Sequence, residues 1–136
     1  MKKRGSVISI VALLVGLGGG AVAEQAVTPK SPLVFTPLAL VNGWVGGPFS
    51  TSKPAVAEAF GIVHFKGAIS SGTTGLAFTL PVGFRPAKIA YVPVDLCNAN
   101  KGRLIISPTG ATSVQALTTF SQAQCFTSLD GASFAE

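Results

Sequence analysis

The sequence predicts an all-β fold of antiparallel strands, either a sandwich or a barrel. From Leu33 onward, short apolar segments are separated by Gly, Pro, Ser, Thr and Asn about every eight to twelve residues, a spacing typical of such folds. No window shows a sustained helical period. We therefore expect no helical connectors and antiparallel pairing of about seven or eight strands.

The first 23 residues have the pattern of a secretory signal peptide. Lys2, Lys3 and Arg4 precede an apolar run over residues 7–17, and small residues follow at 21–23. This order predicts cleavage after position 23. The apolar run is shorter than the roughly 20 residues that a membrane-spanning helix needs. We therefore expect a secreted, extracellular protein with no membrane contact after cleavage.

The rest of the chain supports one domain. Residues 24–32 combine two prolines with small and polar residues, and we expect an extended lead-in there. Removing 23 of 136 residues leaves 113, which is the size of a single domain. That domain should span residues 33–136.

The charge balance excludes one class of partner. Three of the ten Lys and Arg residues belong to the signal peptide, so seven remain against five Asp and Glu, a net charge of +2. The remaining basic residues are spaced singly along the chain. Without a cluster that could neutralise phosphates, we expect no nucleic-acid binding.

Cys97 and Cys125 are the two cysteines of the chain. In an exported protein an even number of cysteines predicts a disulfide, which would stabilise the domain by roughly 3 to 4 kcal/mol. The alternative is a pair of reduced thiols or a link between two molecules.

The first strands are predicted from residues 38–69. Residues 38–41 lead to Asn42-Gly43, a type I′ hairpin signal, and then to residues 44–45. Residues 54–59 are the most helix-compatible stretch. Residues 62–69 show the clearest alternation, and the odd-numbered face should be buried because it carries the aromatic and branched side chains.

The second half of the chain also predicts short strands separated by turns. Pro93 within the apolar segment 87–97 predicts an edge strand or a bulge, because proline lacks the N–H that a central strand needs. The other predicted strands are 76–80, 103–107, 113–117, 125–128 and 133–134, and the predicted turns are 70–75, 108–110 and 130–131.

The stretch from Pro81 to Pro86 predicts a stiff corner between two strands. Pro81 ends one strand, Gly83 lets the backbone turn, and Pro86 fixes the exit. Arg85 lies between them. We expect its guanidinium to tie the corner to a carbonyl oxygen or to a carboxylate such as Asp95 or Asp130. The alternative is that Arg85 reads a ligand.

The chain contains few residues that could act in catalysis or bind a metal. His64 is the single histidine, and no Gly-x-Ser-x-Gly motif surrounds a serine. Spacing in the sequence does not exclude a triad of His64, a serine and either Asp95 or Asp130, because triads are recognised by their geometry. An exposed histidine on a strand is the simpler interpretation. One His and two paired Cys are too few for a zinc site, so we expect no catalytic residues, no metal and no cofactor.

Two aromatic residues are candidates for ligand contact. A flat ring can stack on the apolar face of a sugar or fill a pocket in a partner. Trp44 follows a turn and Tyr91 lies within a strand, so both are candidates, while a place in the core is the alternative. Nine phenylalanines exceed what one thin core needs, which suggests burial between subunits.

Four sequence blocks resemble a β-domain found at the C-terminal ends of bacteriophage tail-fibre and receptor-binding proteins and in small secreted bacterial proteins. They are residues 42–44 (NGW), 61–67 (GIVHFKG), 78–86 (FTLPVGFRP) and 128–134 (SLDGASF). The resemblance implies a compact antiparallel, jelly-roll-like β-sandwich, often a homotrimer. It also implies a surface for receptors or saccharides and no catalytic residues.

The sequence thus predicts a secreted, noncatalytic binding module for a surface polysaccharide or a protein partner. One alternative is a structural coat or fibre component that only associates with itself. Another, less favoured, is a small secreted hydrolase that depends on His64.

Overall fold

The computed structural model describes residues 33–136, so the predicted signal peptide at 1–23 and lead-in at 24–32 lie outside the described residues. The domain contains short strands, one α-helix and two 3-10 helices. The elements are β1 (Thr36–Pro37), β2 (Val45–Gly46), η2 (Pro48–Ser50), β3 (Ala55–Ala59), β4 (Ile62–Lys66), β5 (Ala68–Ser70), β6 (Leu76–Thr79), β7 (Ala90–Asp95), η3 (Cys97–Ala99), β8 (Lys101–Ile106), β9 (Ala111–Ala116), α1 (Phe120–Cys125), β10 (Thr127–Ser128) and β11 (Ser133–Ala135).

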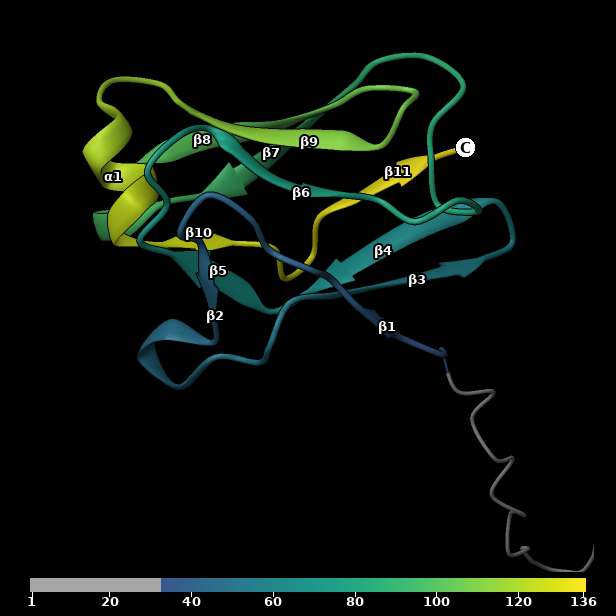
Figure 1. The fold of residues 1–136 in the computed structure, drawn as a ribbon, viewed down its shortest axis with the longest axis horizontal. Helices are drawn as coiled ribbons and strands as arrows, with labels where there is room; N and C mark the ends of the chain where they lie inside the picture. Colours follow the sequence, from purple (N-terminus) through teal and green to yellow (C-terminus); the bar gives the residue numbers. More distant parts are fainter. Residues whose placement is uncertain (1–32) are drawn as a thin grey trace, which may run out of the picture. The chain divides into compact units, whose positions relative to one another are not determined.

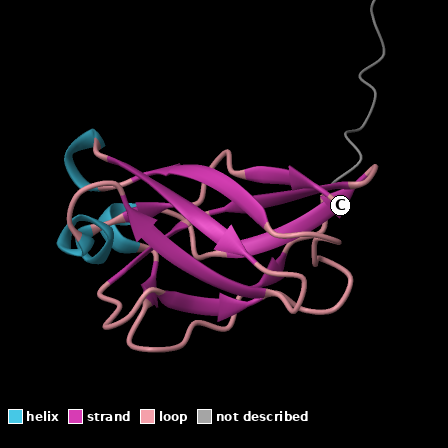
Figure 2. Ribbon diagram, turned by 90° about the horizontal axis from the view of Figure 1, so that it is seen from above, coloured by secondary structure: helices cyan, strands magenta, loops and turns pink. Residues whose placement is uncertain are grey.

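The strands form three antiparallel sheets, which confirms the predicted all-β class. Their orders are β1-β3-β4-β11, β10-β5-β2 and β6-β9-β8-β7. Figure 1 shows β6-β9-β8-β7 as one layer and the other two sheets as the second. The helical segments gather at one end of the strands (Figure 2). Within residues 33–136, no helix is long and apolar enough to cross a bilayer.

The core lies between the two layers. Phe65 of β4 packs 6.1 Å from Phe78 of β6, measured between ring centroids, so the two layers meet through these rings. The side chains of Leu104 and Ile106 on β8 are fully buried in the same cluster. Alternation along the strands therefore sends every second side chain inward, as period-2 patterning requires.

The alternation predicted for residues 62–69 is confirmed from Ile62 to Lys66. It fails at Ala68, which the alternation places on the polar face but which is fully buried, because β5 belongs to a different sheet from β4. Val63 and Phe65 are buried, and Lys66 is exposed. Gly67 separates β4 from β5 with a φ of 94°, and a side chain there would collide with backbone oxygens of Ser52 and Lys53. The N–H of Gly67 donates to Asp130 Oδ1 at 2.7 Å. Two of the resembling blocks thus hold each other in place as parts of the fold.

The turn at Asn42-Gly43 is confirmed, whereas the hairpin expected around it is wrong. Both residues have positive φ (54° and 78°), and the Trp44 N–H donates to the Val41 carbonyl oxygen at 3.2 Å. The segments on either side do not pair with each other, because β2 pairs with β5 and Leu40 bridges to Phe78. Tertiary packing therefore takes the two arms of this turn to different sheets.

The two-residue hairpin lies instead at Phe60-Gly61, between β3 and β4. Both residues have positive φ (54° and 79°), and Ala59 pairs with Ile62. The stretch at 54–59 is a strand although its sequence is helix-compatible. Val56 and Ala57 there are fully buried against neighbouring strands, which outweighs a weak local preference.

The expectation of no helix is wrong at residues 120–125. The segment predicted as a strand from Cys125 to Ser128 begins as the last turn of α1 and contains only the short β10. Ala123 of the helix is buried, and Thr127 Oγ1 donates to its carbonyl oxygen at 2.9 Å. A six-residue helix is too short to show a 3.6-residue period in the sequence.

The predicted corner at Pro81–Pro86 carries the chain across a sheet. The order β6-β9-β8-β7 is a Greek key, in which the chain leaves β6 at one edge and returns as β7 at the other. Figure 1 shows this connection looping around the end of the layer opposite α1. Pro93 of β7 keeps its register with Arg103, so the strand is an edge strand without a break.

Within the corner, the Phe84 N–H donates to the Pro81 carbonyl oxygen at 3.2 Å, and Gly83 has a φ of 104°. Arg85 Nε donates to the carbonyl oxygen of Leu80 at 2.8 Å. Of the partners expected for Arg85, the structure therefore shows a carbonyl. The Cβ of any residue replacing Gly110 would lie 2.7 Å from Arg85 Nε, so this glycine makes room for the guanidinium.

Candidate functional site

One face of the four-stranded sheet is open to solvent and carries charged, polar and aromatic side chains. The inward residues of β7, β8 and β9 include Val92, Leu104 and Val114, all buried. Their neighbours therefore point outward. The outward residues that we call the outer sheet face are Tyr91, Pro93, Asp95, Lys101, Arg103 and Gln115, together with Leu117 after β9, and all are exposed.

Arg103 lies at the centre of the outer sheet face and is held from two sides. Its guanidinium carbon lies 4.7 Å from the centroid of the Tyr91 ring, which is a cation–π distance. Its Nε donates to Gln115 Oε1 at 2.7 Å. Because Arg103 pairs with Gln115 across β8 and β9 and with Pro93 across β7, three strands fix this group.

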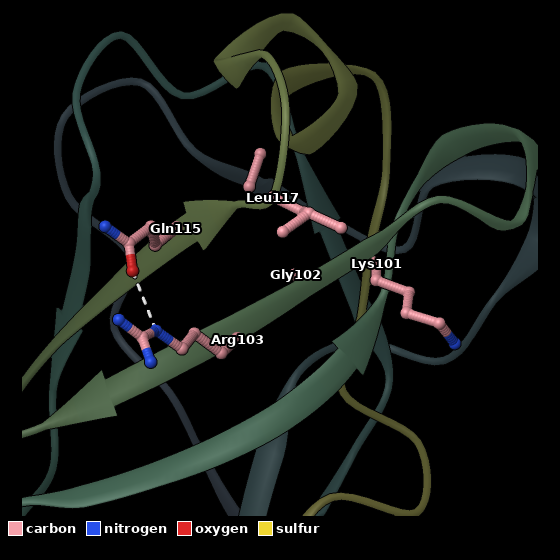
Figure 3. Close-up of a pocket in the computed structure, with 6 residues that line it drawn as sticks. Lys101, Gly102, Arg103, Gln115 and Leu117 are labelled. Atoms are coloured by element: carbon pink, nitrogen blue, oxygen red, sulfur yellow. Dashed lines mark hydrogen bonds between the residues drawn. The ribbon is translucent and has the colours of Figure 1, made fainter.

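A shallow cleft of about 430 Å³ adjoins the guanidinium. Figure 3 shows Arg103 and Gln115 pointing toward each other across two strands, with Leu117 at the end of β9. The Leu117 side chain is 75% exposed. Lys101 also lines the cleft, and its ammonium group points away from Arg103 (Figure 3). The cleft thus combines apolar surface with one positioned cation.

The charge on this face is uneven. Asp95 is the register partner of Lys101, so opposite charges stand across from each other at that end of β7 and β8. Arg103 has only the neutral residues Pro93 and Gln115 as partners across the strands. The positive charge of the outer sheet face is therefore concentrated at Arg103.

The two aromatic candidates have different positions. Tyr91 is 57% exposed on the outer sheet face, where its ring contacts Arg103. Trp44 is only 4% exposed, and its Nε1 donates to the Thr74 carbonyl oxygen at 2.9 Å while Phe120 packs edge-on against the indole. A buried indole with its N–H satisfied is a core residue. The hypothesis of ligand contact therefore passes to Tyr91.

Cys97 and Cys125 form the expected disulfide within one chain, with their Cα atoms 5.7 Å apart. The bridge joins η3 to the last residue of α1. It therefore fastens the segment after β7 to the helix that follows β9, at one end of the outer sheet face.

His64 and the aspartates are not gathered into one site. His64 lies on β4 between β3 and β11 and points away from the core, since its neighbours Val63 and Phe65 are buried. Asp95 lies on the outer face of the opposite layer, and Asp130 accepts the Gly67 N–H. In the described part of the chain, no three His, Cys, Asp or Glu side chains stand close enough to hold a metal ion.

The sequence interpretation missed Arg103, Gln115 and Leu117. A signal was present, because alternation along 101–106 places Lys101 and Arg103 on the face opposite Leu104. The turn at 107–110 closes the hairpin through the Gly110 N–H, which donates to the Ser107 carbonyl oxygen at 2.8 Å. Counting back from that turn gives the pairing of Arg103 with Gln115.

Comparisons with known proteins identify the fold. No family model matches the chain, and no curated protein sequence is significantly similar to it. The structure is similar to the crystal structure of the receptor binding protein gp15 of Listeria phage PSA, with a TM-score of 0.53. The two share 21% sequence identity, and the similarity covers 78% of this chain and 67% of that chain. The resemblance to the β-domain of phage receptor-binding proteins is confirmed at the level of the fold.

Proposed function

We propose that this protein is a noncatalytic binding module that recognises a surface polysaccharide or a protein partner through the outer sheet face. The observation that carries the proposal is the fixed guanidinium of Arg103, held by Tyr91 and Gln115 beside an open cleft. An exposed arginine with two side-chain partners loses less conformational entropy when it binds than a free one. The contacts of Arg103 with Tyr91 and Gln115 lie on the surface and are not part of the core.

The fold likeness supports the same proposal. The similar structure is that of a protein named for receptor binding, and a domain with this fold can offer an open sheet face to a partner. We propose that this chain also acts outside the cell, either secreted or associated with a virion. The predicted signal peptide and the disulfide between Cys97 and Cys125 fit an oxidising compartment.

The test is binding of the purified protein to isolated bacterial envelopes and to the polysaccharides extracted from them. Tyr91→Ala and Arg103→Ala together should remove binding while the thermal midpoint falls by no more than about 4–8 °C, because both side chains lie outside the core and each exposed substitution costs about 0.5 kcal/mol. Lys88→Ala is the control, since Lys88 is exposed and lies outside the outer sheet face. Binding that survives the double substitution would contradict the assignment of the face.

We propose self-association, as a homotrimer, as a second candidate function. Phe49 is 73% exposed, and its ring packs against that of Phe126 with the centroids 5.9 Å apart. Exposed aromatic surface of this kind is often covered in an assembly. Light scattering should give three times the monomer mass, and Phe49→Ser should lower it. A monomer at all concentrations would overturn this second proposal.

A further inference from the structure

We infer that the outer sheet face binds an anionic group, a carboxylate or a phosphate, on a saccharide, and that Arg103 is the residue that receives it. This inference rests on the proposed function and names the ligand class for the same surface. It follows from the orientation of the guanidinium, from the distribution of charge and from the apolar surface around the cleft.

The contacts of Arg103 leave the two terminal nitrogens of its guanidinium available to a ligand. Nε donates to Gln115 Oε1, and the guanidinium carbon lies over the Tyr91 ring. The two terminal nitrogens make no hydrogen bond to any residue of the described domain. Paired N–H groups of this kind match the two oxygens of a carboxylate or phosphate. Tyr91 and Gln115 are thus positioning residues for an anion-binding arginine.

The charge distribution favours an anion over a neutral ligand. Asp95 is the register partner of Lys101, whereas no carboxylate stands opposite Arg103 on β7 or β9. A guanidinium without an acidic partner attracts a negatively charged ligand more strongly than one whose charge a nearby carboxylate balances. Attraction of this kind also increases the rate of encounter at low salt.

The remaining surface fits a sugar ring. Leu117 is 75% exposed at the edge of the cleft, and Tyr91 is 57% exposed, although Arg103 covers part of its ring. These groups offer apolar contact to the C–H face of a sugar. The cleft of about 430 Å³ is open to solvent, so it can contact one side of a polymer chain. Tyr91 is the one aromatic residue of the outer sheet face, so a neutral glycan bound by ring stacking alone would have a single stacking partner there.

The ligand class is tested with two pairs of polymers that share a backbone and differ in whether they carry the charged group. Polygalacturonate is compared with its methyl ester for the carboxylate, and phosphomannan with unphosphorylated mannan for the phosphate. We expect the charged member of at least one pair to bind at least tenfold more tightly in calorimetric titration, about the loss of one charge-assisted hydrogen bond. The pair that shows the difference identifies which anion the site prefers.

Three variants test the role of Arg103 in that binding. Gln115→Glu keeps the shape and the contact to Nε but adds a carboxylate, so it should abolish anion binding without lowering the thermal midpoint. Arg103→Gln should do the same, and Arg103→Lys should retain the salt dependence but lose at least tenfold in affinity, because an ammonium group lacks the paired N–H groups. Lys88→Gln removes one charge elsewhere and should change affinity less than twofold.

The outcomes separate the two proposals. Binding that prefers charged polymers and is lost in Gln115→Glu and Arg103→Gln supports the inference. Equal binding of charged and neutral polymers, or binding that survives both substitutions, overturns the inference and leaves the binding module standing. Failure to bind any of the four polymers and the envelopes overturns the proposed function, and the inference with it.

Discussion

The burial of Trp44 depends on a single glycine, and replacing that glycine by alanine tests the geometry of the core. Gly72 is buried, and a Cβ built on it would overlap the indole of Trp44. Its backbone is outside the left-handed region, so Gly72→Ala introduces a steric conflict without backbone strain. The indole must move, or the segment around Gly72 must shift.

The expected cost combines two effects. Overpacking a tight core costs typically about 1–3 kcal/mol. Displacing the indole also weakens the hydrogen bond from Nε1 to the Thr74 carbonyl oxygen, now 2.9 Å long, at roughly 0.5–1.5 kcal/mol. Alanine restricts the unfolded chain and returns about 0.4–1 kcal/mol. We therefore expect the free energy of unfolding to fall by about 2–3 kcal/mol.

The assay is urea denaturation followed by fluorescence, because the chain contains a single tryptophan. Gly131→Ala is the control, since Gly131 has open space for a Cβ but a φ of 82°. Backbone strain of about 1–2 kcal/mol, less the same contribution of about 0.4–1 kcal/mol from the unfolded chain, should give it a net cost of about 1 kcal/mol. Emission of the folded Gly72→Ala protein should shift to longer wavelength as water reaches the indole.

A double-mutant cycle decides the cause. In a Trp44→Leu background, followed by far-ultraviolet circular dichroism, Gly72→Ala should cost less than about 0.5 kcal/mol because the indole is gone. An equal cost in both backgrounds would show that the conflict does not involve the indole. A cost no larger than that of Gly131→Ala would refute the close approach itself.

Three further substitutions test other parts of the fold. Replacing Cys97 and Cys125 by alanine removes a bridge with a sequence separation of 28, and the chain-entropy estimate gives a loss of about 3.5 kcal/mol in urea denaturation. Arg85→Ala removes the hydrogen bond to the Leu80 carbonyl oxygen and should lower the thermal midpoint by about 4–8 °C without affecting binding. Phe60→Asn should raise the free energy of unfolding by about 1 kcal/mol, because Phe60 is fully exposed with a φ of 54°.

Each of these expectations has a clear contrary result. An unchanged unfolding midpoint without the two cysteines would mean that the bridge does not constrain the unfolded chain. An Arg85→Ala protein that keeps its thermal midpoint but no longer binds would make Arg85 a ligand residue instead of a corner residue. A less stable Phe60→Asn protein would indicate that the phenylalanine makes stabilising contacts in the folded state.

The sequence by itself determined the features that depend on neighbours along the chain. The alternation through Val63 and Phe65 specifies a strand with one buried face, because side chains on a strand alternate whatever lies across from them. Gly83 and the two prolines around it specify a corner, because their dihedral angles are restricted locally. The sequence also predicted a bridge between Cys97 and Cys125, since the chain has no other cysteine, and the structure shows that the bridge lies within one chain.

The tertiary structure alone decided which segments meet. The turn at Asn42-Gly43 looks the same in sequence whether its arms pair with each other or, as they do, with separate strands. Trp44 is in the core because Gly72 leaves room for its indole, and that contact spans many residues of chain. Arg103 gains its partners from the strands on either side of β8. Pairings between distant strands depend on packing energies that no local pattern contains, so the candidate site emerged only from the fold.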